Sequence, residues 1–124
     1  MYVPYFDLDC EMNIDELIKL IDLKTEKCAS MPELRAEIDQ LDRTIVNMLK
    51  IRQGYMEQAA EIKQSRETVR DNERVEDVVK KVTDHAKDVG ASPELVDELY
   101  RTMIEWSINY EFGKFDEIKN KKIG

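Results

Sequence analysis

Arg52 and Lys63 are the two residues whose types and spacing point most directly to chemistry. They stand 11 positions apart in a stretch, residues 30–66, that reads as one long helix. Because successive helical residues turn by about 100°, the two side chains share a face to within about 20° and lie roughly 16 Å apart along the axis. Two long cationic side chains that lean toward each other can hold one small dianion, so the spacing predicts an anion site.

Arg52 also occupies a position where a purely structural helix would carry an apolar residue. The apolar positions around it alternate four and three apart, which is typical of a helix that packs lengthwise against other helices. They are Leu34, Ile38, Leu41, Ile45, Met48, Tyr55, Ala59 and Ile62. A cation buried in such a seam needs an anionic partner. We interpret the missing partner as a small-molecule substrate.

Arg35 lies on the same helix but at the wrong distance for the same site. It precedes Arg52 by 17 residues, which corresponds to about 25 Å and a turn of about 100°. An antiparallel second copy of the chain would bring it to the site of its partner. The apolar seam is also longer than two short helices can cover, so we expect an all-α helical-bundle homodimer.

Two shorter helices are predicted after the long one. The first spans about 72–89 and stops at Gly90, and the second begins at Ser92-Pro93 and runs to about Lys114. The apolar seam of the second comprises Val96, Leu99, Met103, Trp106 and Tyr110. We therefore divide the chain into an extension with a short helix at about 13–26 (residues 1–29), a helical domain (30–115) and a charged tail (116–124).

Four further polar residues belong to the expected site. Ser107 and Glu111 are four apart and share a face beside the seam of the last helix. Asp71 and Arg74 stand at the start of the 72–89 helix. Together with the two cations of the long helix, they would form a pocket with apolar walls. Taken singly, such residues are also compatible with solvated helix faces, where ion pairs contribute little.

Composition excludes several other classes of function. The formal net charge is −8, from 19 basic and 27 acidic residues, and no basic tract is available to contact the phosphates of a nucleic acid. No apolar run approaches the roughly 20 residues that span a bilayer, and no signal peptide is evident. We expect a cytoplasmic protein. With one histidine and two cysteines, Cys10 and Cys28, no Cys/His metal site is predicted, and we do not expect a disulfide.

The sequence resembles the all-helical (type II) chorismate mutases and the related isochorismate pyruvate lyases over about residues 28–115. The family's opening pattern Leu-Arg-x-x-Ile-Asp-x-Leu-Asp stands at 34–42, and Arg52 and Lys63 follow at the family's spacing. The ordered set continues with Val69-Arg70-Asp71-Asn72-Glu73-Arg74, then Ile104-Glu105-Trp106-Ser107, and then Glu111. The fold implied is a three-helix protomer in an intertwined dimer.

The resemblance also implies roles for the site residues. The two substrate carboxylates would be bound by Arg35 of the other subunit, Arg52 and Arg74. The remaining contacts implied are Lys63 and Glu111 at the ether oxygen, Asp71 at the ring hydroxyl, and Ser107 in the pocket wall. The reaction implied is the conversion of chorismate to prephenate, a concerted rearrangement that uses no cofactor and no metal.

Two residues depart from the common mutase pattern and leave alternatives open. Many bacterial mutases have Gln where this chain has Glu111, and Val75 replaces a Glu that mutases commonly use on the ring hydroxyl. The lyases, which form salicylate and pyruvate, also have an apolar residue at the position of Val75, and Trp106 and Cys28 look lyase-like. Asp71 favours the mutase. A third possibility is a non-catalytic helical dimerisation or regulatory module.

Overall fold

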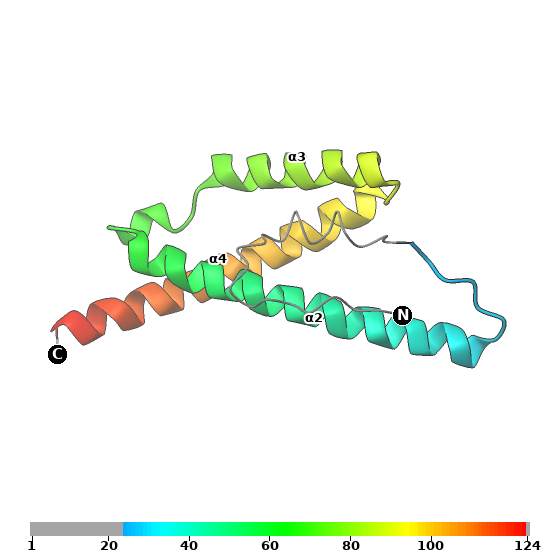
Figure 1. Cartoon of the computed structure of the whole chain (residues 1–124). Helices are drawn as coiled ribbons and strands as arrows, with labels where there is room; N and C mark the ends of the chain where they lie inside the picture. Colours follow the sequence, from blue (N-terminus) through cyan, green and yellow to red (C-terminus); the bar gives the residue numbers. More distant parts are fainter. Residues whose placement is uncertain (1–23, 124) are drawn as a thin grey trace, which may run out of the picture. The chain divides into compact units, whose positions relative to one another are not determined.

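The described part of the chain is built from helices. A computed structural model describes residues 24–123. Within this range α2 spans Met31–Ile62, the 3-10 turn η1 spans Arg66–Thr68, α3 spans Asn72–Val89 and α4 spans Pro93–Ile123 (Figure 1). None of these residues lies in a β-strand, and the all-α prediction is confirmed.

Two compact units divide the chain, Met1–Asp42 and Arg43–Gly124. In the first unit, a variant of the predicted capping box begins α2. The Glu33 N–H donates to Ser30 Oγ at 3.3 Å, and the Glu33 carboxylate accepts from the Ala29 N–H at 2.9 Å. These bonds satisfy backbone donors that a helix start leaves without partners, so α2 begins where the sequence predicts.

The predicted short helix at 13–26 lies mostly outside the described residues, as does Cys10. Residues 24–28 are described and form no helix, so the prediction that this helix reaches Glu26 is wrong at its end. The β-branched Thr25 is a weak helix former, and the next residues lead directly into the cap of α2.

In the second unit α2 ends at Ile62, earlier than the predicted end at residue 66. The Lys63 N–H still donates to the Ala59 carbonyl at 3.0 Å. A connecting segment, residues 63–71, then leads through η1 to α3. It places the Val69 side chain in the core, and burial of that side chain favours ending α2 early.

The predicted limits of α3 and the predicted start of α4 are confirmed. The Asp71 carboxylate caps α3 by accepting from the Arg74 N–H at 3.1 Å. Gly90 ends α3 with φ of 81°, a left-handed conformation that glycine adopts without a steric penalty. Ser92 Oγ accepts from the Leu95 N–H at 3.2 Å and caps α4.

Helix α4 is longer than predicted. It continues to Ile123, whereas we expected it to end near Lys114 because of Gly113. Phe115 is buried, and Ile118 packs against the core. Burying two large apolar side chains contributes more than the roughly 1 kcal/mol that one glycine costs a helix, which explains why the helix does not end there.

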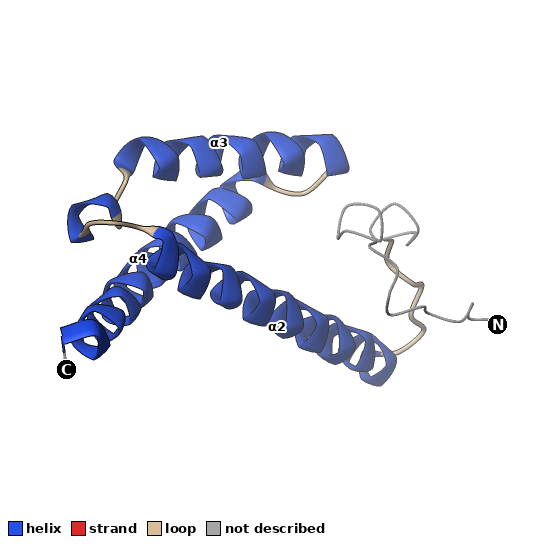
Figure 2. Ribbon diagram, turned by 60° about the vertical axis from the view of Figure 1, so that its left-hand side comes forward, coloured by secondary structure: helices blue, strands red, loops and turns tan. Residues whose placement is uncertain are grey.

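The core of the second unit lies between α3 and α4. Helix α3 runs antiparallel along the first part of α4, and the last turns of α2 cross α4 further along (Figures 1 and 2). The buried apolar cluster comprises Ala60, Val69, Val79, Ile104, Ile108 and Phe115. Three helices and the connecting segment therefore meet around one small core.

The buried face of α4 differs from the predicted seam. Ile104 and Ile108 are buried, whereas Leu99 and Trp106 are 59% and 54% exposed. The predicted seam was wrong by one residue, or about 100° around the helix. Both faces of α4 carry apolar residues at helical spacing, so periodicity alone did not distinguish them.

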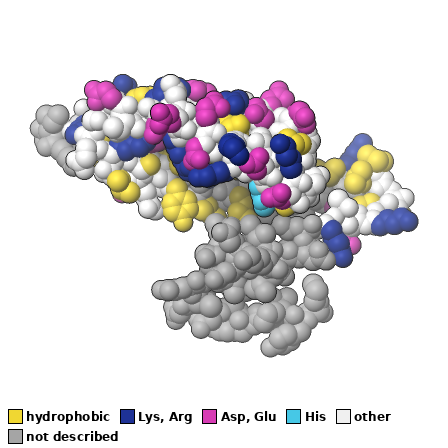
Figure 3. Space-filling view, turned by 90° about the horizontal axis from the view of Figure 1, so that it is seen from above, with side chains coloured by type: hydrophobic (Ala, Val, Ile, Leu, Met, Phe, Trp, Pro, Cys, Tyr) yellow, Lys and Arg dark blue, Asp and Glu magenta, His cyan; other side chains and the backbone are white. Residues whose placement is uncertain are grey.

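The outer side of α3 carries acidic and basic side chains in mixed order (Figure 3). Asp77 pairs with Lys81 at 2.9 Å, and Lys80 pairs with Asp84 at 2.7 Å. His85 is exposed on the same helix. Ion pairs on such a solvated face contribute little to stability. None of the described helices is long and apolar enough to cross a membrane.

Candidate functional site

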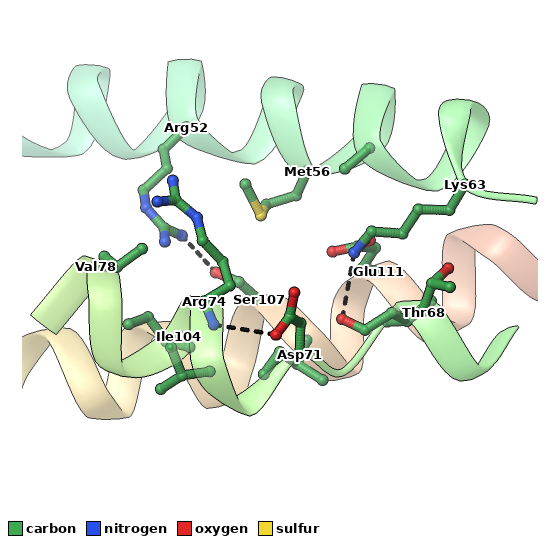
Figure 4. Close-up of a pocket in the computed structure, with 14 residues that line it drawn as sticks. Arg52, Met56, Lys63, Thr68, Asp71, Arg74, Val78, Ile104, Ser107 and Glu111 are labelled. Atoms are coloured by element: carbon green, nitrogen blue, oxygen red, sulfur yellow. Dashed lines mark hydrogen bonds and ion pairs between the residues drawn. The ribbon is translucent and has the colours of Figure 1, made fainter. Parts of the chain in front are cut away.

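A pocket of about 310 Å³ lies within the second unit. Its walls come from the last turns of α2, the connecting segment, the first turns of α3 and the middle of α4 (Figure 4). The lining residues are Arg52, Met56, Ala59, Lys63, Thr68, Val69, Asp71, Arg74, Val75, Val78, Ile104, Ser107, Ile108 and Glu111. The volume suits a small organic molecule.

Arg52 and Ser107 form one end of the pocket. Arg52 is half-buried and donates from Nη1 to Ser107 Oγ at 2.6 Å, and Ser107 Oγ donates in turn to the Met103 carbonyl at 2.8 Å. Burial lowers the pKa of the Arg52 guanidinium; the Tyr100 side chain opposes this shift, and the charge of Arg74 adds to it. An arginine nevertheless stays protonated in proteins, so this end carries a positive charge.

Lys63 and Glu111 form the other end. Lys63 Nζ lies 2.5 Å from Glu111 Oε1 and donates to the Val69 carbonyl at 3.3 Å. The Glu111 side chain is only 5% exposed and that of Lys63 is 27% exposed. The direction of the Lys63–Glu111 contact does not meet hydrogen-bond geometry, and Oε1 is buried without a donor. We therefore treat the contact as an ion pair that leaves hydrogen-bonding capacity at Glu111.

The first turn of α3 contributes residues of mixed character. Asp71 accepts the Arg74 N–H as the helix cap, so one of its oxygens is already engaged. The Arg74 guanidinium pairs with Asp77 at 2.6 Å, and both side chains are largely exposed. Val75 is half-buried and presents an apolar surface to the pocket. In Figure 4, Arg74 reaches up beside Arg52.

Arg35 is the predicted site residue that does not line this pocket. It belongs to the first unit and its side chain is exposed. All the other predicted site residues line the pocket, namely Arg52, Lys63, Asp71, Arg74, Val75, Ser107 and Glu111.

Several lining residues were absent from the sequence-based set. Met56 stands between Arg52 and Lys63 on α2, and the same helical rotation that pairs the two cations would have found it. Thr68 and Val69 come from the connecting segment. Their positions depend on how the segment leaves α2, and no sequence pattern indicates that path.

The geometry defines a class of protein. Three cationic side chains border a pocket whose walls are largely apolar, and two hydroxyl and two carboxyl groups lie among them. Such a site suits a small organic anion, because the charges bind carboxylates while apolar walls exclude water and strengthen each electrostatic contact. The second unit is therefore a helical domain whose pocket suits a small anionic compound.

Comparison with known families agrees with this class. The model of the family "Chorismate mutase type II" matches residues 34–112, a range that contains every predicted site residue. The chain belongs to the chorismate mutase type II family. A search of curated proteins gave no match.

Proposed function

We propose that this protein is a chorismate mutase that converts chorismate to prephenate. The observation that supports it most strongly is the convergence of Arg52 and Lys63 with Ser107 and Glu111 on one pocket, in a chain of this family. The reaction breaks the ether carbon–oxygen bond and forms a carbon–carbon bond within the same molecule, so no atom enters or leaves. Such a reaction needs a site that holds the reactive conformation and stabilises the charge that develops.

In this proposal some side chains bind the substrate and others stabilise the charge that develops during the reaction. Arg52 and Arg74 bind the substrate carboxylates and hold the reactive conformation, while Ser107 orients the guanidinium of Arg52 through a hydrogen bond. Lys63 donates to the ether oxygen as negative charge grows on it, which lowers the barrier, and Glu111 lies beside the same oxygen and pairs with Lys63. Asp71 contacts the ring hydroxyl. The apolar walls keep water away from these charges.

We further propose that the active form is a homodimer in which Arg35 reaches the site of the partner. The supporting observation is a row of exposed apolar side chains along α2, and solvent contact with so many of them is unfavourable. They include Leu34, Ile38, Leu41, Ile45, Met48, Leu49 and Tyr55. A second α2 laid against this row would cover it.

Mixing two inactive variants tests the shared site. Arg35→Ala and Arg52→Met each damage every site in their own homodimers. If Arg35 acts across the interface, random mixing gives heterodimers with one intact site each, and about a quarter of the wild-type activity returns. Restored activity is measured as prephenate formation after exchange of subunits. No recovery, although sedimentation shows heterodimers, would mean that Arg35 does not complete the partner's site.

Separate incubations with chorismate and isochorismate test the reaction itself. Prephenate from chorismate, detected by its absorbance after conversion to phenylpyruvate in acid, is the expected result. Salicylate and pyruvate from isochorismate, with no product from chorismate, would overturn the proposal.

The isochorismate pyruvate lyase activity is the second candidate. The observation that favours it is Val75, which presents an apolar wall where the mutases commonly place a carboxylate. Val75→Glu distinguishes the candidates, because a carboxylate there should improve binding of a ring hydroxyl and so raise mutase activity. A regulatory module without turnover would bind neither compound.

A further inference from the structure

The connecting segment between α2 and α3 is a part of the pocket wall with little regular structure. Thr68, Val69 and Asp71 line the pocket from this segment. The Val69 carbonyl also accepts the hydrogen bond from Lys63 at 3.3 Å. The position of this short backbone stretch, together with the Glu111 carboxylate at 2.5 Å, therefore sets where the Lys63 ammonium points.

Arg70 lies between two of these lining residues and has no role in the site itself. Its guanidinium forms two parallel hydrogen bonds to Glu105 of α4, Nη1 to Oε1 at 2.9 Å and Nη2 to Oε2 at 2.7 Å. Glu105 follows the lining residue Ile104 and precedes Ser107 by two positions. The pair thus joins the connecting segment to α4. Side chains next to Arg70 and Glu105 in both elements line the pocket.

The geometry of the pair fixes orientation as well as distance. A bidentate arginine–carboxylate contact holds both groups in one plane, which a single ammonium contact does not. The Arg70 hydrogen bonds hold the pKa of Glu105 below its ordinary value, so the carboxylate is ionised near neutral pH. The other end of the segment is held separately: Arg66 Nε donates to Asp116 Oδ1 at 3.1 Å, and its guanidinium lies 4.4 Å from the centre of the Phe112 ring.

A second bidentate pair in the same unit provides a contrast. Arg101 donates to Glu76 at 2.9 Å and 3.1 Å and joins α4 to α3. Its side chains are about as exposed as those of Arg70 and Glu105. The two helices are already packed together through Val79 and the core, so this pair has little left to position. Exposed ion pairs of this kind usually contribute little.

We propose that Arg70 and Glu105 are a positioning pair for the pocket: by fixing the connecting segment to α4, they set the positions of the Val69 carbonyl and Asp71, and through the Val69 carbonyl they influence the direction of Lys63. The inference rests on the proposed function for its catalytic consequence, but its structural part does not depend on which substrate is used.

Glu105→Ala and Glu76→Ala form a matched pair of test variants, since each removes an exposed carboxylate from a bidentate contact on a helix. We expect Glu105→Ala to lower kcat by about tenfold, because small displacements of a catalytic group are costly, with KM changed less. Arg70→Lys should behave similarly, since it keeps the charge and loses the fork. The reversed pair Arg70→Glu/Glu105→Arg should recover part of the loss. Glu76→Ala should leave kcat unchanged.

Hydrogen exchange of the backbone amides at 66–71 provides a readout that does not depend on turnover. The positioning role is supported if these amides exchange faster than in the wild type in Glu105→Ala but not in Glu76→Ala, while the two variants have equal melting temperatures. Unchanged exchange in Glu105→Ala, or equal effects of the two variants on kcat, would overturn it. A wild-type protein that converts neither chorismate nor isochorismate would refute the proposed function, while the exchange comparison would still decide the positioning role.

Discussion

Each end of the pocket contains a cationic side chain, but only one of the two cations is paired with a carboxylate. At one end, Arg52 donates to a neutral hydroxyl, and no carboxylate within residues 24–123 is ion-paired with it. At the other end, Lys63 lies against the buried carboxylate of Glu111. One cation is uncompensated and the other already has its counter-charge.

This difference separates binding from chemistry. An uncompensated, half-buried guanidinium attracts an anion from outside the protein, so we assign recognition of a substrate carboxylate to the Arg52 end. At the Lys63 end the ion pair with Glu111 leaves less net charge to attract an anion, and we assign to Lys63 a hydrogen bond to the ether oxygen on which negative charge develops.

Arg52→Met should have the largest effect of any single substitution. It removes the uncompensated cation and keeps a similar apolar stem, so kcat/KM should fall by about 10³-fold. The melting temperature should be unchanged or higher, because a desolvated charge is also lost. Arg52→Lys is the control. It keeps the positive charge but loses the planar guanidinium that can form two parallel hydrogen bonds, so it should retain part of the activity. Equal activity of Arg52→Met and wild type would show that Arg52 takes no part in binding or catalysis.

Lys63→Met should affect both activity and stability. It leaves the Glu111 carboxylate buried without its cation, which should cost about 2 kcal/mol of unfolding free energy, less than for a fully buried pair because Lys63 is partly exposed. The double variant Lys63→Met/Glu111→Gln should regain this stability in denaturant titrations but remain about 10²-fold less active. Restored activity in the double variant would show that Lys63 serves the fold and not the reaction.

Glu111→Gln should leave kcat equal to or above that of the wild type. The amide keeps the shape of the side chain and donates a hydrogen bond, whereas the carboxylate paired with Lys63 repels the negative charge that develops on the ether oxygen. The measurement is kcat of both proteins at saturating substrate. A fall as large as that of Lys63→Met would mean that the reaction needs the carboxylate itself.

Ser107→Ala should have the smallest effect. The hydroxyl orients the Arg52 guanidinium through one hydrogen bond of 2.6 Å, and losing such a bond to a charged group costs a few kcal/mol at most. Water can replace the missing acceptor, so we expect kcat/KM to fall by about tenfold or less. A loss as large as that of Arg52→Met would mean that Ser107 contacts the substrate directly.

The site residues on α2 and directly after it could be predicted from sequence, because the hydrogen bond from the Lys63 N–H to the Ala59 carbonyl continues the helical rotation as far as Lys63. The helical rotation places Arg52 and Lys63 on one face, and the structure has both in the lining of one pocket. Capping residues likewise gave the limits of α3. In each case the signal is local, so one sequence is enough.

Other features depend on contacts between helices and could not be predicted from local sequence patterns. The buried face of α4 was predicted one residue away from Ile104 because both faces are apolar. Helix α4 passes Gly113 because Phe115 finds a place in the core. The connecting segment enters the pocket through Val69 because α2 ends early. Tertiary packing decided each of these, and helix propensity alone did not.

The sharpest test of anion binding at Arg52 is calorimetric titration with a bicyclic dicarboxylate mimic of the chorismate transition state, with wild-type protein and Arg52→Met compared under the same conditions. We predict saturable binding to the wild type and a large loss of affinity in the variant, whose circular dichroism should match the wild type. Equal affinity in the two proteins, or no binding to the wild type at all, would show that Arg52 does not bind a substrate carboxylate in this pocket.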